Sequence, residues 1–191
     1  MAWPPAVLAV DKVNTTAQQN DHPAHHNAIA GAINDLRSLI PYKPTYCRVY
    51  KTASTQTIPN TTPTPITWDG ETEDLAGVHG ANSSRFTIPA GLDGIWQFTA
   101  SIIWNGASAG FAVLRFWVNG ATTHQIGKVD AKWMGAGDFT GHQSTFTLSL
   151  AAGDFVEAVA SQNSGGGIAL IGAANPNEVA SNMTAVRLGS R

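Results

Sequence analysis

The clearest strand in this 191-residue sequence is the stretch Ile95-Trp96-Gln97-Phe98-Thr99-Ala100-Ser101-Ile102-Ile103-Trp104. Its even-numbered positions, from Trp96 to Trp104, are all apolar, whereas Gln97, Thr99 and Ser101 occupy alternate positions. Because successive side chains of a strand point to opposite faces, this alternation predicts a strand with one buried face. We therefore expect a sheet whose core lies on the Trp96 side.

Short segments of similar character lie on both sides of this strand, with no helical pattern between them. The expected strands are Thr45 to Lys51, Thr64 to Asp69, Ser84 to Ile88, Phe111 to Val118, Thr145 to Leu150, Phe155 to Ser161 and Thr184 to Leu188. Turn signals separate them at Asp69-Gly70, Pro89-Ala90-Gly91, Asn119-Gly120, Ala152-Gly153-Asp154 and Gly165-Gly166-Gly167. About eight to ten short strands at regular spacing are typical of an antiparallel sandwich or jelly roll.

The segment Phe111 to Val118 is apolar on both faces. Ala112, Leu114, Phe116 and Val118 suit the core, and the opposite face carries Phe111, Val113, Arg115 and Trp117. So apolar an outward face should not be left in water, and its simplest explanation is contact with a neighbouring subunit. The alternative is an aromatic platform for a ligand.

Residues 21–40 form the one convincing helical segment. Asp21 and Pro23 are typical of a helix start, and Pro41 ends the pattern. A heptad seam follows the helix at Ile29, Ile33, Leu36 and Ile40. Isoleucine-rich seams favour three-stranded coiled coils, but this one is too short to associate alone. The alternative is a single amphipathic helix packed on its own domain.

The composition excludes several classes of protein. Charged residues are 13% of the chain and the formal net charge is −2, so no basic field attracts nucleic acid. No stretch approaches the roughly 20 apolar residues needed for membrane insertion, and we expect no signal peptide. Cys47 is the only cysteine, which rules out an intrachain disulfide.

Three segments resemble characteristic segments of C1q-like domains. They are Phe86-Thr87-Ile88-Pro89-Ala90-Gly91-Leu92-Asp93-Gly94-Ile95-Trp96-Gln97-Phe98, Leu150-Ala151-Ala152-Gly153-Asp154-Phe155-Val156 and Ala185-Val186-Arg187-Leu188-Gly189. The first departs from the family in the additional residues between Pro89 and Gly94. The resemblance implies a mainly β C1q/TNF-like jelly-roll domain over residues 45–191 that forms a homotrimer. Residues 1–44 then form a separate N-terminal arm and helix.

Together with Gln162-Asn163-Ser164-Gly165-Gly166, this domain resembles the C1q-like modules of tailed-bacteriophage virion proteins. Three N-terminal segments are similar to the starts of phage minor tail and fibre proteins, namely Asp11-Lys12-Val13-Asn14, His26-Asn27-Ala28-Ile29 and Ala32-Ile33-Asn34-Asp35-Leu36. The resemblance implies a structural protein made in the host cytoplasm and attached to the virion, on capsid, tail or fibre. We expect residues 1–40 to contact other virion proteins, with Trp3, Val7 and Leu8 as apolar anchors.

The histidines near the helix start suggest a metal site. His22, His25 and His26 lie close together, and three copies on a three-fold axis would offer neutral imidazoles to zinc or nickel. The alternative is that His22 and His26 are polar residues of the seam. No second-shell partner is evident, so we expect no metal and no other cofactor.

The densest acidic run, Asp69 to Asp74, suggests glycoside hydrolysis by paired carboxylates such as Glu71 and Asp74. Its setting beside Gly70 and Gly77 indicates a solvated loop or a calcium contact instead, and His79, His124 and His142 are scattered among expected turns. We therefore expect no enzymatic activity. A host cell-surface glycan remains an alternative partner, contacted by loops that hold Trp133-Met134-Gly135 or Asn105-Gly106-Ala107.

Overall fold

The computed structural model describes residues 22–39, 45–52, 55–80, 83–105, 110–120, 125–134, 140–173 and 181–190. Within these ranges, side chains are described except at 22–25, 36–39 and 125–134. The chain divides into two compact units, Met1–Lys43 and Pro44–Arg191.

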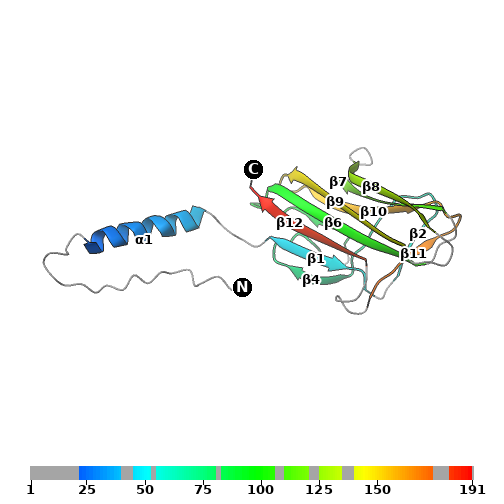
Figure 1. The fold of residues 1–191 in the computed structure, drawn as a ribbon, viewed down its shortest axis with the longest axis horizontal. Helices are drawn as coiled ribbons and strands as arrows, with labels where there is room; N and C mark the ends of the chain where they lie inside the picture. Colours follow the sequence, from blue (N-terminus) through cyan, green and yellow to red (C-terminus); the bar gives the residue numbers. More distant parts are fainter. Residues whose placement is uncertain are drawn as a thin grey trace. The chain divides into compact units, whose positions relative to one another are not determined.

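The first unit contains helix α1, His22–Leu39, and the second contains twelve strands within the described ranges (Figure 1). The strands are β1 Tyr46–Tyr50, β2 Gln56–Ile58, β3 Thr64–Pro65, β4 Gly70–Asp74, β5 Arg85–Thr87, β6 Gly94–Asn105, β7 Gly110–Val118, β8 Gln125–Met134, β9 Thr140–Leu150, β10 Phe155–Gln162, β11 Ile168–Leu170 and β12 Asn182–Gly189.

These strands form two antiparallel sheets that pack face to face. The first sheet has the order β2-β11-β6-β12-β1-β4, with β9 paired to the other edge of β6, and the second has the order β3-β10-β7-β8, with β5 paired to β10. Neighbouring strands are often far apart in sequence, as where β1 pairs with β12. This crossed order confirms the predicted jelly-roll sandwich.

The core lies between the two sheets and is rich in aromatic rings. The inward side chains of β6, including Trp96, Phe98 and Trp104, are completely buried, as the alternation predicts. Phe146 of β9 stacks on Phe98 at 5.3 Å and also meets Phe116 of the second sheet at 4.5 Å. These ring contacts join the two sheets, since aromatic pairs add to the free energy of apolar burial.

Four strands were not predicted from the sequence, namely β2, β4, β8 and β11, and the predicted strand Thr64 to Asp69 forms a strand only at Thr64–Pro65. Gly70–Asp74, predicted to be an acidic loop, is strand β4, and Trp133-Met134, predicted to lie in a loop, ends strand β8. Each is the last strand in its sheet's order. One edge of such a strand has no neighbouring strand and faces water. The acidic side chains of β4 therefore cost little free energy there.

The turn at Asn119-Gly120 is in its predicted place but does not close a two-residue hairpin. Both residues have positive φ, 57° and 65°, as the sequence predicts. Trp117, however, pairs with Gln125, so the connection to β8 is longer. Asn119 is instead fastened to the start of β10: its backbone N–H donates to the carbonyl of Phe155 at 2.8 Å, and its side-chain oxygen accepts from Phe155 N at 3.0 Å.

Candidate functional site: the exposed surfaces

Helix α1 presents apolar side chains to solvent. Ile29 is 59% exposed and Ile33 is 36% exposed, although both belong to the predicted seam. The side chain of Leu36 and all of Ile40 lie outside the described residues. The described part of the seam therefore carries exposed apolar side chains.

The outward face of β7 carries the four side chains that the sequence assigns to it. Phe111 is 40% exposed, whereas Val113, Arg115 and Trp117 are half-buried. On this same face Val159 of β10, which lies between Arg115 of β7 and Pro65 of β3 in the sheet, is completely buried. The open part of this face is therefore its Phe111 end.

The other end of this face holds a charged cluster. Glu157 of β10 is buried, and its Oε1 accepts from Ser84 Oγ at 2.8 Å and from Arg85 Nε at 3.2 Å. The guanidinium of Arg85 also lies over the ring of Phe155, 4.1 Å from its centre. These contacts fix β5 to β10, because a buried carboxylate needs a cation and hydrogen-bond donors.

The outward face of the first sheet is uncharged across three strands. Its positions are Ile95, Gln97, Thr99, Ser101 and Ile103 of β6, Gly141, Gln143, Thr145, Thr147 and Ser149 of β9, and Asn182, Thr184, Val186 and Leu188 of β12. Charged residues on this face occur only farther along the sheet, on β1 and β4. Broad surfaces without charge are typical of protein contacts, because charged groups are costly to desolvate.

Asp74 and Glu71 of the acidic run make contacts that hold the local structure. The carboxylate of Asp74 accepts from the backbone N–H groups of Ala76 (3.2 Å), Val78 (3.1 Å) and His79 (2.9 Å). Glu71 Oε2 lies 3.4 Å from Nδ1 of His79, whose Nε2 lies 3.2 Å from the Ser83 carbonyl oxygen. These contacts hold the turn after β4 against β5.

Two of the histidines that the sequence places among turns are packed instead. The His79 side chain is only 2% exposed and its ring packs on Phe86, at 5.4 Å between ring centres. His142 lies within β9, is 1% exposed and meets the Trp104 ring edge to face. The sequence did not predict that these histidines are buried, because the rings they pack against, Phe86 and Trp104, lie on other strands. His124 lies outside the described residues.

Cys47 is buried in the core on β1, where it pairs with Asp74 of the acidic strand β4. Burial raises the pKa of its thiol far above the ordinary value, and the nearby carboxylates of Asp74 and Glu71 raise it further. The neutral thiol is a poor nucleophile and a poor metal ligand.

Several predicted residues remain without structural description. Trp3, Val7, Leu8, Gly106 and Ala107 lie outside the described residues. His22 begins α1, and His26 is exposed on it. Within the described ranges, no group of three His, Cys, Asp or Glu residues is placed to hold a metal ion. No described helix is both long and apolar enough to cross a bilayer.

Comparison with solved structures identifies the fold. The globular domain of zebrafish complement 1qA has a TM-score of 0.53 at 12% identity, covering 78% of this chain and 100% of that one. Eiger TNF from S. frugiperda has a TM-score of 0.51 at 14% identity, covering 78% of this chain and 95% of that one. The PRD1 vertex protein P5 has a TM-score of 0.53 at 13% identity, covering 76% and 99%.

The sandwich is therefore a C1q/TNF-like jelly roll, as the sequence resemblance implied. No protein-family model matches the sequence, and no curated protein matches it either. At these identities the likeness shows the fold alone.

Proposed function

We propose that this chain is a structural protein of a tailed-bacteriophage virion: a homotrimer anchored by its N-terminus that displays the jelly-roll domain. It acts as a minor tail, fibre or capsid decoration protein and has no enzymatic activity. Similarity of the domain to a phage vertex protein supports a place on a particle. The observation that carries the trimer is the exposure of Ile29 and Ile33 on α1.

Exposed isoleucines four residues apart on a helix are costly in a monomer. Burying one such side chain contributes about 1.5–3 kcal/mol, and three helices that share a seam bury it in every copy. Because the seam is short, the jelly-roll domains must add contacts of their own. Two of their surfaces are candidates: the β7 face of Phe111, Val113, Arg115 and Trp117, and the uncharged face of β6, β9 and β12.

The mass of the full chain in solution tests the trimer. Sedimentation equilibrium is expected to give three times the 20.1-kDa chain mass at micromolar concentration. Ile29→Asp with Ile33→Asp should shift the protein to smaller species, because charges cannot be buried in the seam. Asn27→Asp with Asn34→Asp adds the same charge on the opposite side of α1 and should leave the mass unchanged. A monomeric unsubstituted chain would contradict the proposal.

The place on a particle needs a separate test. Residues 1–40 are proposed to contact other virion proteins, with Trp3, Val7 and Leu8 as anchors. Antibody labelling of purified particles in the electron microscope is expected to mark capsid, tail or fibre. Particles that lack the protein by mass spectrometry would rule out a virion role.

Binding of a host cell-surface glycan is a second candidate. The observation in its favour is Phe111, an exposed aromatic residue that pairs with Trp133 across β7 and β8. Aromatic rings of this kind can stack on sugars. A glycan array probed with the full chain should then give signals that Phe111→Ala removes and Thr145→Ala keeps. If the chain binds no glycan on the array, only the structural role remains.

A further inference from the structure

Large apolar side chains are exposed at three places in the described part of the chain. Ile29 and Ile33 lie on α1, and Phe111 lies on the outward face of β7. The remaining three are Leu75 (52% exposed), Ile95 (41%) and Leu188 (55%). These last three come from separate stretches of sequence, and the register of the first sheet shows where they meet.

The strand pairing places them together at one end of the first sheet. Leu75 N donates to the carbonyl of Tyr46 at 3.0 Å, so Leu75 lies beside the first residue of β1. Tyr46 in turn pairs with Val186 of β12. Leu188 lies two residues farther along β12, where the pairing of β12 with β6 is irregular. The residue after it, Gly189, pairs with Ile95 of β6. We call Leu75, Tyr46, Val186, Leu188 and Ile95 the base patch.

The base patch is built on a firmly held part of the sandwich. An Nη of Arg187 donates to the carbonyl of Asp93 at 2.7 Å, which ties the end of β12 to the start of β6. Gly94 has φ 149°, and a Cβ there would overlap the carbonyl of Gly189. Such close backbone approach fixes the two strands at this end. The exposed leucines are thus presented by ordered backbone.

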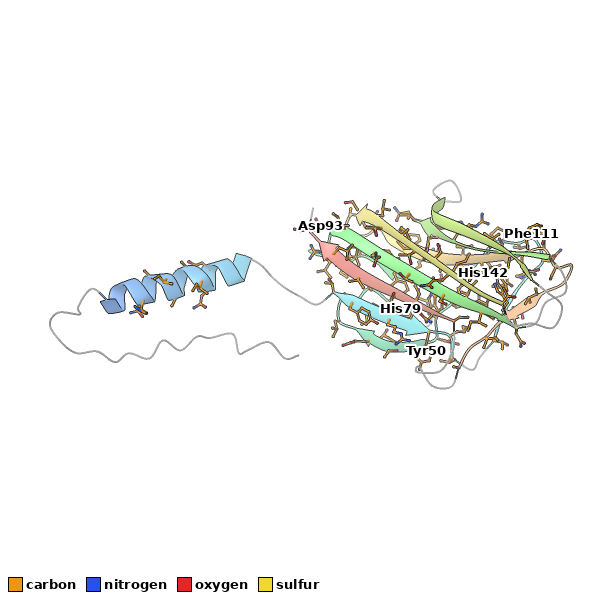
Figure 2. All side chains as sticks on the ribbon, in the orientation of Figure 1. Tyr50, His79, Asp93, Phe111 and His142 are labelled. Carbon is orange, nitrogen blue, oxygen red and sulfur yellow. The ribbon has the colours of Figure 1, made fainter. Side chains whose placement is uncertain are left out.

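The base patch lies at the end of the sandwich where β1 begins. Tyr46 begins β1, and Figure 2 shows Asp93, next to Gly94 at the start of β6, at the opposite end of the sandwich from Phe111. Only residues 40–44 separate α1 from Thr45. Five residues span at most about 17 Å, so association of the α1 helices would draw the base patches of different copies toward one axis.

We propose that the base patch is a self-association surface, and that each copy packs it against the base patches of the other copies around the trimer axis. This inference rests on the proposed homotrimer and identifies where the domains touch. None of the five side chains is charged, so they can leave water at little cost. The exposed isoleucines of α1 lie just before the short connection, and Tyr46 of the base patch lies just after it. Association of the helices would therefore bring the base patches together, so we expect a second copy to cover both surfaces.

Chemical cross-linking of the full chain tests the proposal. Leu188→Cys and Phe111→Cys place thiols at two similarly exposed positions on opposite ends of the sandwich, while Cys47 is buried and should stay silent. With a short bismaleimide, Leu188→Cys is expected to give covalent dimers on denaturing gels, and Phe111→Cys is expected to give none. Reversal of this pattern would assign the contact to the β7 face instead.

A second variant tests the base patch even if the introduced thiols are not positioned to cross-link. Ile95→Gln with Leu188→Gln removes apolar surface without touching the core, so circular dichroism should remain unchanged. The concentration at which the trimer dissociates is expected to rise at least tenfold. A trimer by mass whose dissociation is unaffected and whose Leu188→Cys form does not cross-link would overturn the base patch alone. A monomer by mass would overturn the homotrimer as well.

Discussion

Cys47 gives the folded domain a specific dependence on alkaline pH. Up to the ordinary thiol pKa of 9.0, both the folded and the unfolded thiol are protonated. Above it the unfolded thiol ionises while the buried thiol does not, because burial raises its pKa. This part of the stability is therefore present at neutral pH and lost as the pH rises, by about 1.4 kcal/mol per pH unit.

Urea unfolding of wild type and Cys47→Ala measures this effect. At neutral pH the variant should be less stable by about 1 kcal/mol, because it leaves a small cavity. The difference is expected to shrink, and then reverse, between about pH 8 and about pH 10. A constant difference across that range would show that the thiol titrates alike in both states.

Asp74 is predicted to matter for stability, in contrast to its neighbour on the same strand. Asp74→Ala leaves three backbone N–H groups without their carboxylate acceptor and should lower the free energy of unfolding by about 2 kcal/mol. Glu73→Ala removes an exposed carboxylate and should change it by less than about 0.5 kcal/mol. Thermal unfolding of both variants provides the comparison, and equal effects would mean that Asp74 does not hold the turn.

At the scale of elements, how far the sequence predicts the fold depends on how each strand is buried. β6 was predicted almost to its ends because its apolar residues alternate strictly, which is what one buried face requires. β4 was missed because acidic residues rarely form strands. It forms by pairing with β1, as where Asp74 pairs with Cys47, and a contact between residues so far apart in the chain cannot be read from a local pattern. The base patch was missed for the same reason: its members come from four separate stretches and meet only through strand register.

Hydrogen exchange should separate the central strand from the edge strand. β6 has β12 on one side and β9 on the other, whereas β4 pairs with β1 alone. Amides of Phe98 to Ile102 are therefore expected to exchange slowest, near the rate of global unfolding, and those of β4 much faster. Exchange followed by mass spectrometry resolves both segments, and equal protection would contradict this order of local stabilities.

At the scale of the whole molecule, an obligate trimer should melt at a temperature that depends on protein concentration. Association stabilises the folded state by mass action, so raising the concentration tenfold should raise the melting temperature measurably. The double variant Ile29→Asp, Ile33→Asp should lose most of this dependence. Differential scanning calorimetry at several concentrations gives the slope, and a flat slope for the wild type would indicate folding as independent monomers.

The pairing of β1 with β12 has a practical consequence for displaying foreign peptides. Because β1 begins at the end of the sandwich where β12 finishes, a peptide fused directly after β12 would start beside the base patch and should interfere with assembly (Figure 1). The bend at Ser164-Gly165-Gly166 joins β10 to β11 and is solvent-exposed at both glycines. An epitope inserted there should be carried on the assembled oligomer without disturbing it, which makes this bend the better site for a vaccine or targeting scaffold.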